Sequence, residues 1–293
     1  MGRRAALGGE LRRVLSVVPP GTLYHYTSQR ALIEIVKKCV LWATEIRFLN
    51  DAKEFVLAVD VAGRELGKAG PRCADAHERE LLADIARLIE HPHQWGSYVC
   101  VASFSAQGDL LSQWRAYSPS SSGCAIGFAS AGLVAAARDQ GFRLVPCVYD
   151  EATQGRLVAE AIDGTLRDFR RDVAAGGNVY DRREWHAAQF AGRLLWLAPM
   201  LKHPTFREEE EWRLVSDPTP HTHKRVSYRE GKSRILPYYE LELAKDHETL
   251  PIACIMIGPT PDFDLAHTSV MGFLVRWTGQ SHIAHSKIPY RDW

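Results

Sequence analysis

Segments with the pattern of β-strands are gathered into blocks in this 293-residue chain, and helical segments separate the blocks. Compact or alternating apolar runs that predict strands fall at 23–27, 40–44, 97–105, 123–129, 142–150, 209–216, 224–230, 233–243, 252–258 and 281–289. Helical spacing of apolar residues falls at 28–39, 51–66, 74–90, 151–203 and 264–276. Helices and strands segregated in this way predict an α+β fold with a mainly antiparallel sheet, and they exclude a doubly wound parallel sheet.

The chain contains no internal repeat, low-complexity tract or linker-like stretch. Its length fits one large domain or two small ones. We therefore predict a single domain over 1–293, with 1–21 as an N-terminal helical extension and 151–203 as a helical insertion.

The bulk composition excludes several classes of protein. Lys and Arg total 36 against 35 Asp and Glu, so net charge gives no argument for a nucleic-acid or membrane partner. No stretch approaches the ~18 apolar residues of a membrane span. The six cysteines are scattered without a Cys-x-x-Cys pair, which is typical of reduced thiols. These features predict a cytoplasmic protein that is not bound to a membrane.

Familiar signatures of cofactor, hydrolase and metal sites are missing. There is no Gly-x-Gly-x-x-Gly after the first strand and no Gly-x-Ser-x-Gly elbow. Gly231-Lys232-Ser233 resembles the end of a phosphate-binding loop, but Val226 stands where the upstream glycine is required. The two His-x-His pairs lack a third ligand at zinc spacing, so no metal site is predicted.

Two groups near the N-terminus are candidate ligand contacts. His25 and Thr27 share one face of the first predicted strand, where an imidazole and a hydroxyl can bind a ligand hydroxyl. A half-buried histidine satisfied by the protein itself is the alternative interpretation. Arg47 follows the second strand, where a fixed guanidinium can hold a phosphate. The adjacent Asp51 and Glu54 are also explained by a helix cap.

A third group lies in the middle of the chain. Ser103 and Ser105 share one face of a predicted strand, and small hydroxyl residues at a strand end let a flat ring approach the sheet. In the helical turn predicted at 109–118, Trp114 and Tyr117 are three residues apart and share a face. A pair of core aromatic residues is the alternative explanation.

Four consecutive acids at 208–211 form the most specific feature. If the acids begin a strand, Trp212 and Leu214 face the core, and Glu209, Glu211 and Arg213 line the opposite face with carboxylates ~7 Å apart. Crowded carboxylates can stabilise positive charge on a substrate or act as a base. A solvated charge run is the alternative, although acids are poor strand formers.

In order along the chain, these pieces resemble the bacterial family called domain of unknown function 2971 (DUF2971). The stretches that carry the resemblance are LYHYTS, LWATEIRFLND with Glu54, SFS followed by LSQWRAYS and GCAIGF, FREEEEWRL, and the C-terminal SRILPYYELEL, IACIMIGP and SKIPYR. The resemblance covers roughly residues 22 to 291.

The same order of motifs resembles, more distantly, the mono-ADP-ribosyltransferases. His25 matches the histidine on their first strand, Ser103-Phe104-Ser105 resembles their middle-strand motif, and Glu209-Glu210-Glu211 resembles their Glu-x-Glu. This resemblance implies an α+β split β-sandwich of mainly antiparallel strands with helical insertions, and NAD as the substrate without a metal.

The resemblance also implies a role for each candidate. Breaking the bond between nicotinamide and ribose builds positive charge on the ribose. Glu211 would stabilise that cation, and Glu209 would orient or deprotonate the nucleophile. The expected NAD contacts are His25 and Thr27 on hydroxyl groups, Arg47 on the pyrophosphate, and Ser105 with Trp114 or Tyr117 beside the nicotinamide.

We therefore hypothesise an NAD-dependent mono-ADP-ribosyltransferase. The resemblance suggests a toxin or phage-defence effector that modifies a protein or a nucleic acid and that has an antitoxin or defence-system partner. One alternative is an NAD glycohydrolase that uses the same site with water as acceptor. Another is a non-catalytic module that senses a nucleotide or binds a partner. The sequence leaves open which glutamate of 208–211 is catalytic.

Overall fold

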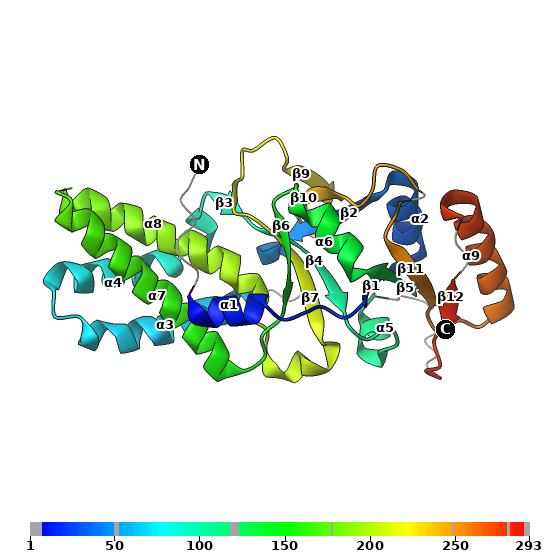
Figure 1. Cartoon of the computed structure of the whole chain (residues 1–293), viewed down its shortest axis with the longest axis horizontal. Helices are drawn as coiled ribbons and strands as arrows, with labels where there is room; N and C mark the ends of the chain where they lie inside the picture. Colours follow the sequence, from blue (N-terminus) through cyan, green and yellow to red (C-terminus); the bar gives the residue numbers. More distant parts are fainter. Residues whose placement is uncertain are drawn as a thin grey trace.

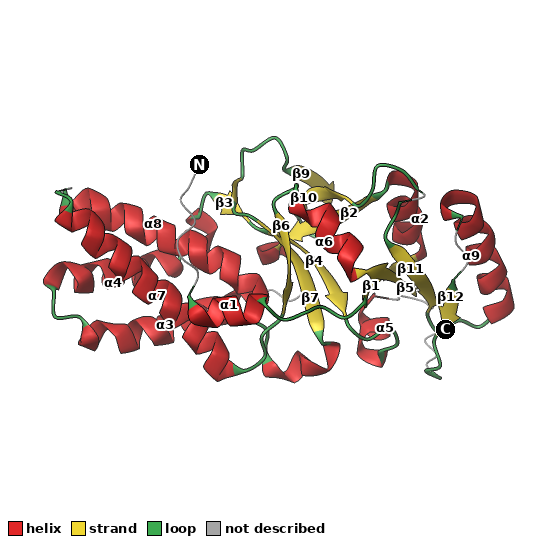
Figure 2. Cartoon of the chain, in the orientation of Figure 1, coloured by secondary structure: helices red, strands yellow, loops and turns green. Residues whose placement is uncertain are grey.

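The computed structural model describes residues 8–49, 53–117, 123–176, 178–247, 249–279 and 282–289. A bundle of helices forms one end of an elongated molecule, a β-sheet occupies the middle, and further helices lie at the other end (Figure 1). Colouring by secondary structure shows the same segregation of helices and strands (Figure 2).

One large sheet dominates the β-structure. The strands are β1 (Thr22–Ser28), β2 (Val40–Glu45), β3 (Ser97–Tyr98), β4 (Cys100–Ser105), β5 (Gly123–Ala129), β6 (Phe142–Pro146), β7 (Glu211–Ser216), β8 (Thr219–Pro220), β9 (Ser227–Glu230), β10 (Ile235–Glu242), β11 (Ile252–Ile257) and β12 (Ile283–His285). Ten of these strands form the sheet, in the order β12-β11-β5-β1-β4-β2-β10-β9, with β7 also paired to β4 and β6 to β7. The described pairs of strands in it are antiparallel except β11 with β12. The predicted α+β class with a mostly antiparallel sheet is confirmed.

Most of the helices fall into two sets by position. They are α1 (Gly9–Leu15), α2 (Gln29–Lys38), α3 (Lys53–Ala69), α4 (Ala76–Ile89), α5 (Leu111–Tyr117), α6 (Ser130–Arg138), α7 (Glu151–Ala174), α8 (Val179–Leu197) and α9 (Phe263–Thr278). Helices α1, α3, α4, α7 and α8 make the bundle, whereas α2, α6 and α9 lie along the sheet (Figure 1). Among the described residues, no helix is long and apolar enough to cross a membrane.

The sheet buries both of its faces, each against a different set of helices. On one face, which we call the sheet-core face, Leu23, Phe104 and Leu214 pack with apolar residues of α2, α6 and α9. On the other face, which we call the site face, Val101 and Val215 pack with the bundle helices. The period of two along each strand assigns alternate residues to these two cores.

Local sequence explains several of the boundaries. Ser28 caps α2, because its side chain accepts a hydrogen bond from the Ala31 amide, 3.2 Å away. Asp150 caps α7 in the same way through the Thr153 amide. The predicted elements at 23–27, 40–44 and 123–129 are confirmed as β1, β2 and β5. Helix α6 was not expected, since its small residues carry little helical periodicity.

Two expected features lie partly or wholly outside the described residues. The helix predicted near Asp51 begins as α3 at Lys53, and the proposed cap at Asp51 falls outside the described ranges. Of the predicted N-terminal extension over 1–21, helix α1 is described.

Candidate active site

The acidic run does not enter the sheet as a continuous strand. Glu209 ends the 3₁₀ helix η6 (Pro204–Glu209), Glu210 has a left-handed backbone with φ of 41°, and β7 begins at Glu211. The expectation that Glu209 shares a strand face with Glu211 is therefore wrong. The predicted facing of Trp212 and Leu214 toward the core is confirmed, since both belong to the sheet core.

The carboxylates of Glu209 and Glu211 nevertheless meet at one cation. The Lys202 ammonium donates to Glu209 Oε2 and to Glu211 Oε2. Arg213 adds two bonds to Glu211, from Nε to Oε1 at 2.7 Å and from Nη2 to Oε2 at 3.0 Å. We call Lys202, Glu209, Glu211 and Arg213 the carboxylate cluster.

Burial distinguishes the two carboxylates of the cluster. Glu211, Lys202 and Arg213 are buried, and Arg213 is only 1% exposed. The Glu209 side chain is 14% exposed, so it forms the outer part of the cluster. Glu208 and Glu210 of the same run are exposed and lie outside the cluster. The geometry thus singles out Glu209 and Glu211 from the four acids.

The two cations keep Glu211 ionised. Burial by itself would raise the pKa of the Glu211 carboxyl, but Arg213 and Lys202 outweigh burial and hold this pKa well below its ordinary range. Arg213 is fixed in turn by the Pro199 carbonyl, which accepts from Nη1 at 3.0 Å. The cluster therefore holds a carboxylate in its charged form within a protein interior.

Ser105 lies beside the cluster at the end of β4. The strand registers pair Ser105 with Glu211 on one side and with Tyr24 on the other, so these three side chains share the site face. Ser105 Oγ donates to the Glu209 carbonyl at 2.7 Å and accepts from the Gln107 amide at 2.9 Å. Ser105 thus ties the end of β4 to the backbone that carries Glu209.

His25 and Thr27 project from the opposite face. Tyr24 is on the site face, so the alternation along β1 places His25 and Thr27 on the sheet-core face. The His25 ring lies 5.8 Å from that of Phe104, a residue of the sheet core. The sheet therefore separates His25 and Thr27 from Ser105 and Glu211, which the resemblance to mono-ADP-ribosyltransferases implies in one site.

His25 bonds to the backbone at a branch in the sheet. One edge of β4 pairs with β2 at Cys100 and Val101 and with β1 at Ser105. Between these points, His25 Nδ1 donates to the Ser103 carbonyl at 2.9 Å. Burial lowers the pKa of His25, which favours the neutral ring that makes this bond.

Arg47 is held by neighbouring protein groups. Its guanidinium donates to the Glu45 carboxylate at 2.8 Å, to the Pro92 carbonyl at 2.7 Å and to the Ser97 carbonyl at 2.8 Å. It also lies over the Tyr98 ring, 5.5 Å from the ring centre. This arrangement gives Arg47 a structural role, and a pyrophosphate contact by Arg47 stays a prediction.

The buried Glu45 carboxyl makes stability depend on pH. Burial raises the pKa of Glu45 from an ordinary 4.5 to about 6, and Arg47 only partly offsets this effect. Because the folded pKa lies above the unfolded one, the stabilisation from Glu45 is present below pH 4.5 and is lost as pH rises through about 6. We expect the free energy of unfolding, measured in urea relative to Glu45→Gln, to fall by about 2 kcal/mol between pH 4 and 7.5. A difference that grows with pH would contradict this expectation.

Trp114 and Tyr117 differ in environment although they share a helix. Trp114 is fully buried, its Nε1 donates to Asp109 Oδ1 at 2.7 Å, and its ring meets Tyr26 edge to face at 4.7 Å. Tyr117 is 40% exposed at the end of α5. Trp114 thus belongs to a small core cluster with Tyr26 and Ala125, which is the core alternative expected for it.

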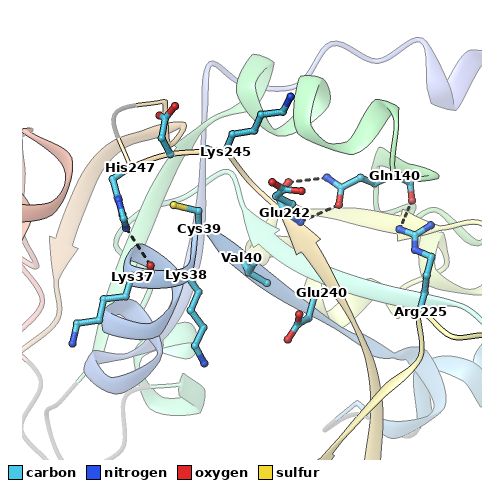
Figure 3. A pocket seen from close by; sticks show the side chains of 12 residues that line it. Lys37, Lys38, Cys39, Val40, Gln140, Arg225, Glu240, Glu242, Lys245 and His247 are labelled. Atoms are coloured by element: carbon cyan, nitrogen blue, oxygen red, sulfur yellow. Dashed lines mark hydrogen bonds between the residues drawn. The ribbon is translucent and has the colours of Figure 1, made fainter.

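A groove of about 570 Å³ opens elsewhere, at the start of β2 and the end of β10 (Figure 3). Lys37, Lys38, Lys245 and Arg225 line it together with acidic side chains from β10. Gln140 bonds there to the backbone of Glu242 and accepts from Arg225 through its own carbonyl at 2.7 Å. None of the predicted site residues lines this groove.

Sequence reasoning missed the cations of the cluster. Lys202 follows apolar residues and precedes a histidine. The one feature that could have indicated its ion pairs is that a lysine in apolar surroundings requires a charged partner. Arg213 was placed on the correct face without its ion pair. Within the described ranges, no three His, Cys, Asp or Glu side chains gather as they would to hold a metal ion.

Comparison with known proteins gives one match. Residues 113–214 match the model of a protein family of unknown function, DUF2971. The match supports the resemblance in this part of the chain, which includes Trp114, Tyr117, Glu209 and Glu211 but not His25 or Ser105. No curated protein and no solved structure matches the chain.

Proposed function

We propose that this protein cleaves the bond between nicotinamide and ribose in NAD and transfers the ADP-ribose to a macromolecule. The observation that carries the proposal is the pair of carboxylates, Glu209 and Glu211, held by one lysine beside Ser105 on the site face. Carboxylates placed in this way suit a reaction that develops positive charge on a sugar ring.

The proposed reaction uses the inner and outer carboxylates differently. The C–N glycosidic bond breaks, the electron pair leaves with nicotinamide, and a nucleophilic oxygen or nitrogen of the acceptor bonds to the ribose carbon. Glu211, kept ionised by Arg213 and Lys202, supplies fixed negative charge near that carbon. Glu209 is the more exposed of the two. It gives up its contact with Lys202, hydrogen-bonds the nucleophile and accepts the proton of the nucleophile.

The branch at β4 supports a split β-sandwich of the ADP-ribosyltransferase type. Strands β1 and β2 both pair with one edge of β4 but at different points, so the sheet opens between them. His25 bonds to the β4 backbone at this opening. In the proposal His25 is a positioning residue that fixes β4 and thereby Ser105, rather than a direct contact of Glu211.

The test is incubation of the purified protein with NAD labelled in the adenylate, with and without cell extract. We expect nicotinamide release and transfer of label to macromolecules. Glu209→Gln should lower the rate by about 10²–10³-fold, as is typical when one preorganised electrostatic group is removed. Glu208→Gln and Glu210→Gln are matched controls, because both carboxylates are exposed neighbours outside the cluster, and they should stay within about twofold of the wild type.

The outcomes separate the candidate functions. Release of free ADP-ribose without labelled macromolecule would favour the NAD glycohydrolase. Failure of the wild type to release nicotinamide would reject both enzymes and leave the nucleotide-sensing or interaction module. The labelled acceptor, protein or nucleic acid, would indicate what a toxin or phage-defence effector of this kind attacks, and co-purification would identify an antitoxin or defence-system partner.

A further inference from the structure

Residues 224–235, which lead into β9 and through the turn to the start of β10, concentrate positive charge in a chain that is nearly neutral. The cations of this segment are Lys224, Arg225, Arg229, Lys232 and Arg234, and Glu230 is its one acid, whereas Glu240 and Glu242 lie further along β10. Over the whole chain the net charge is +1. The β9–β10 hairpin also lies at the end of the sheet, because β9 is its last strand in the order of pairing. The charge of this segment therefore lies at one edge of the sheet.

The same hairpin exposes apolar surface. Tyr228 is 56% exposed and Ile235 is 67% exposed. The register pairs Ile235 with Glu230, so Tyr228, Glu230 and Ile235 lie on one face of the hairpin. A hollow of about 440 Å³ is lined there by Tyr228, Arg229, Glu230, Gly231, Arg234 and Ile235. The hollow thus combines an aromatic ring, an aliphatic side chain and the arginine Arg234 with the acid Glu230.

The turn that joins the strands is tightly built. The Gly231 amide donates to the Arg234 carbonyl at 3.1 Å. A Cβ at Gly231 would lie 2.7 Å from that same carbonyl oxygen, so only glycine fits. This turn holds Lys232 and Arg234, both exposed, at the tip of the hairpin.

The side chain of Arg229 supports the hairpin from its other face. Nη2 donates to Thr44 Oγ1 at 3.0 Å, and the guanidinium lies over Trp42, 5.8 Å from the ring centre. Its Nε is buried and has no hydrogen-bond partner among the described residues. Trp42, which is 40% exposed, packs on Tyr238 with ring centres 4.7 Å apart. This second exposed aromatic ring therefore lies on the Arg229 face of the hairpin, opposite to the face of Tyr228.

We infer that the β9–β10 hairpin binds single-stranded nucleic acid. An exposed aromatic ring beside exposed cations is the combination that holds a flexible polyanion whose bases are free to stack. A duplex buries the faces of its bases and would engage only the cations, and the carboxylates of an acidic peptide offer no ring to stack on Tyr228. Bases stack on Tyr228, with Ile235 beside them, and the backbone phosphates contact Lys232 and Arg234. This binding needs no NAD and stands independently of the proposed reaction.

The test is fluorescence anisotropy of the full-length protein with labelled 20-nucleotide oligo(dT) and oligo(U), titrated at several salt concentrations. Tyr228→Ala should weaken binding about tenfold or more, as expected for loss of one stacked base, and Tyr228→Phe should bind like the wild type. Lys232→Gln with Arg234→Gln should reduce the slope of log affinity against log salt by about 1.4, which corresponds to two phosphate contacts on a single strand.

A matched control removes the same charge elsewhere. Arg64→Gln with Arg182→Gln changes two exposed arginines of the helical bundle and should leave binding within about twofold. The inference is overturned if the wild type binds neither oligonucleotide, or if the bundle variant loses as much affinity as the hairpin variant. Equal affinity for a 20-base-pair duplex, with no effect of Tyr228→Ala, would also overturn it.

Discussion

Replacing Arg213 with methionine is expected to lower the free energy of unfolding by about 3–5 kcal/mol. The guanidinium makes two hydrogen bonds to Glu211 and one to the Pro199 carbonyl, and the side chain is 1% exposed. Methionine fills similar volume but leaves Glu211 buried with Lys202 as its remaining described cation. Equilibrium urea denaturation at pH 7.5 measures the effect.

A double variant separates charge from packing. Arg213→Met combined with Glu211→Leu removes both members of the pair, so it should recover most of the loss because no uncompensated charge remains. A single variant as stable as the wild type would show that the pair contributes nothing to folding. A double variant no more stable than the single one would assign the loss to packing or to the Pro199 contact.

The pH dependence of the same variant follows from the direction of the Glu211 pKa. Because the folded pKa lies below the unfolded one, the stability contributed by Glu211 is present above pH 4.5 and is lost as pH falls through the folded pKa. In Arg213→Met this acid-side loss should shrink, since much of the cause of the low pKa is gone.

The order of helices and strands could be predicted from sequence because the buried apolar residues recur at the period of the element that carries them. Along β7, Trp212 and Leu214 face the sheet core, and Glu211 and Arg213 face the other way. The same period of two predicts the strand at 97–105, which contains β4, whereas β5 is predicted by a compact apolar run bounded by turn residues. Helix α6 could not be predicted because small residues dominate it, and its buried residues Ser130, Leu133 and Ala137 do not form a broad apolar stripe.

The site could be predicted only in part. Sequence shows which side chains of one strand share a face, but the pairing register is needed to match that face with a face of the neighbouring strand. Sequence shows that His25 and Thr27 share a face, and that Ser103 and Ser105 do. It does not show which face of β1 aligns with which face of β4. The pairing of Tyr24 with Ser105 decides this, and it places His25 across the sheet from Glu211.

The charged partners could not be predicted because they come from distant or irregular segments. Glu209 contacts Lys202 from the end of a 3₁₀ helix, and Glu210 separates it from β7 with a left-handed backbone. Arg47 is held by carbonyls of Pro92 and Ser97, some fifty residues away. No local pattern encodes contacts of this kind, whereas a helix cap such as Ser28 is encoded within four residues.

Replacing Trp114 is expected to have the second large effect on stability. The result distinguishes a core role from a ligand contact for the aromatic pair on α5, Trp114 and Tyr117. Trp114→Ala is expected to lower the free energy of unfolding by about 3–5 kcal/mol, because a fully buried indole is lost along with its bond to Asp109. Its six-membered ring packs so closely on Gly258 that a Cβ there would lie 3.0 Å from it. The cavity left behind therefore cannot close without moving the backbone between β11 and α9.

Tyr117 is the matched control, one helical turn away on the same helix and 40% exposed. Tyr117→Ala should cost less than about 1 kcal/mol in the same urea titration. Trp114→Phe should lie between the two, because it keeps a ring against Tyr26 but loses the donor to Asp109. If Trp114→Ala unfolds at the same urea concentration as the wild type but no longer releases nicotinamide from NAD, Trp114 is a ligand contact and not a core residue. If stability falls as expected, any loss of activity in that variant follows from the fold, and Tyr117 is the residue of the pair still available to face a nicotinamide.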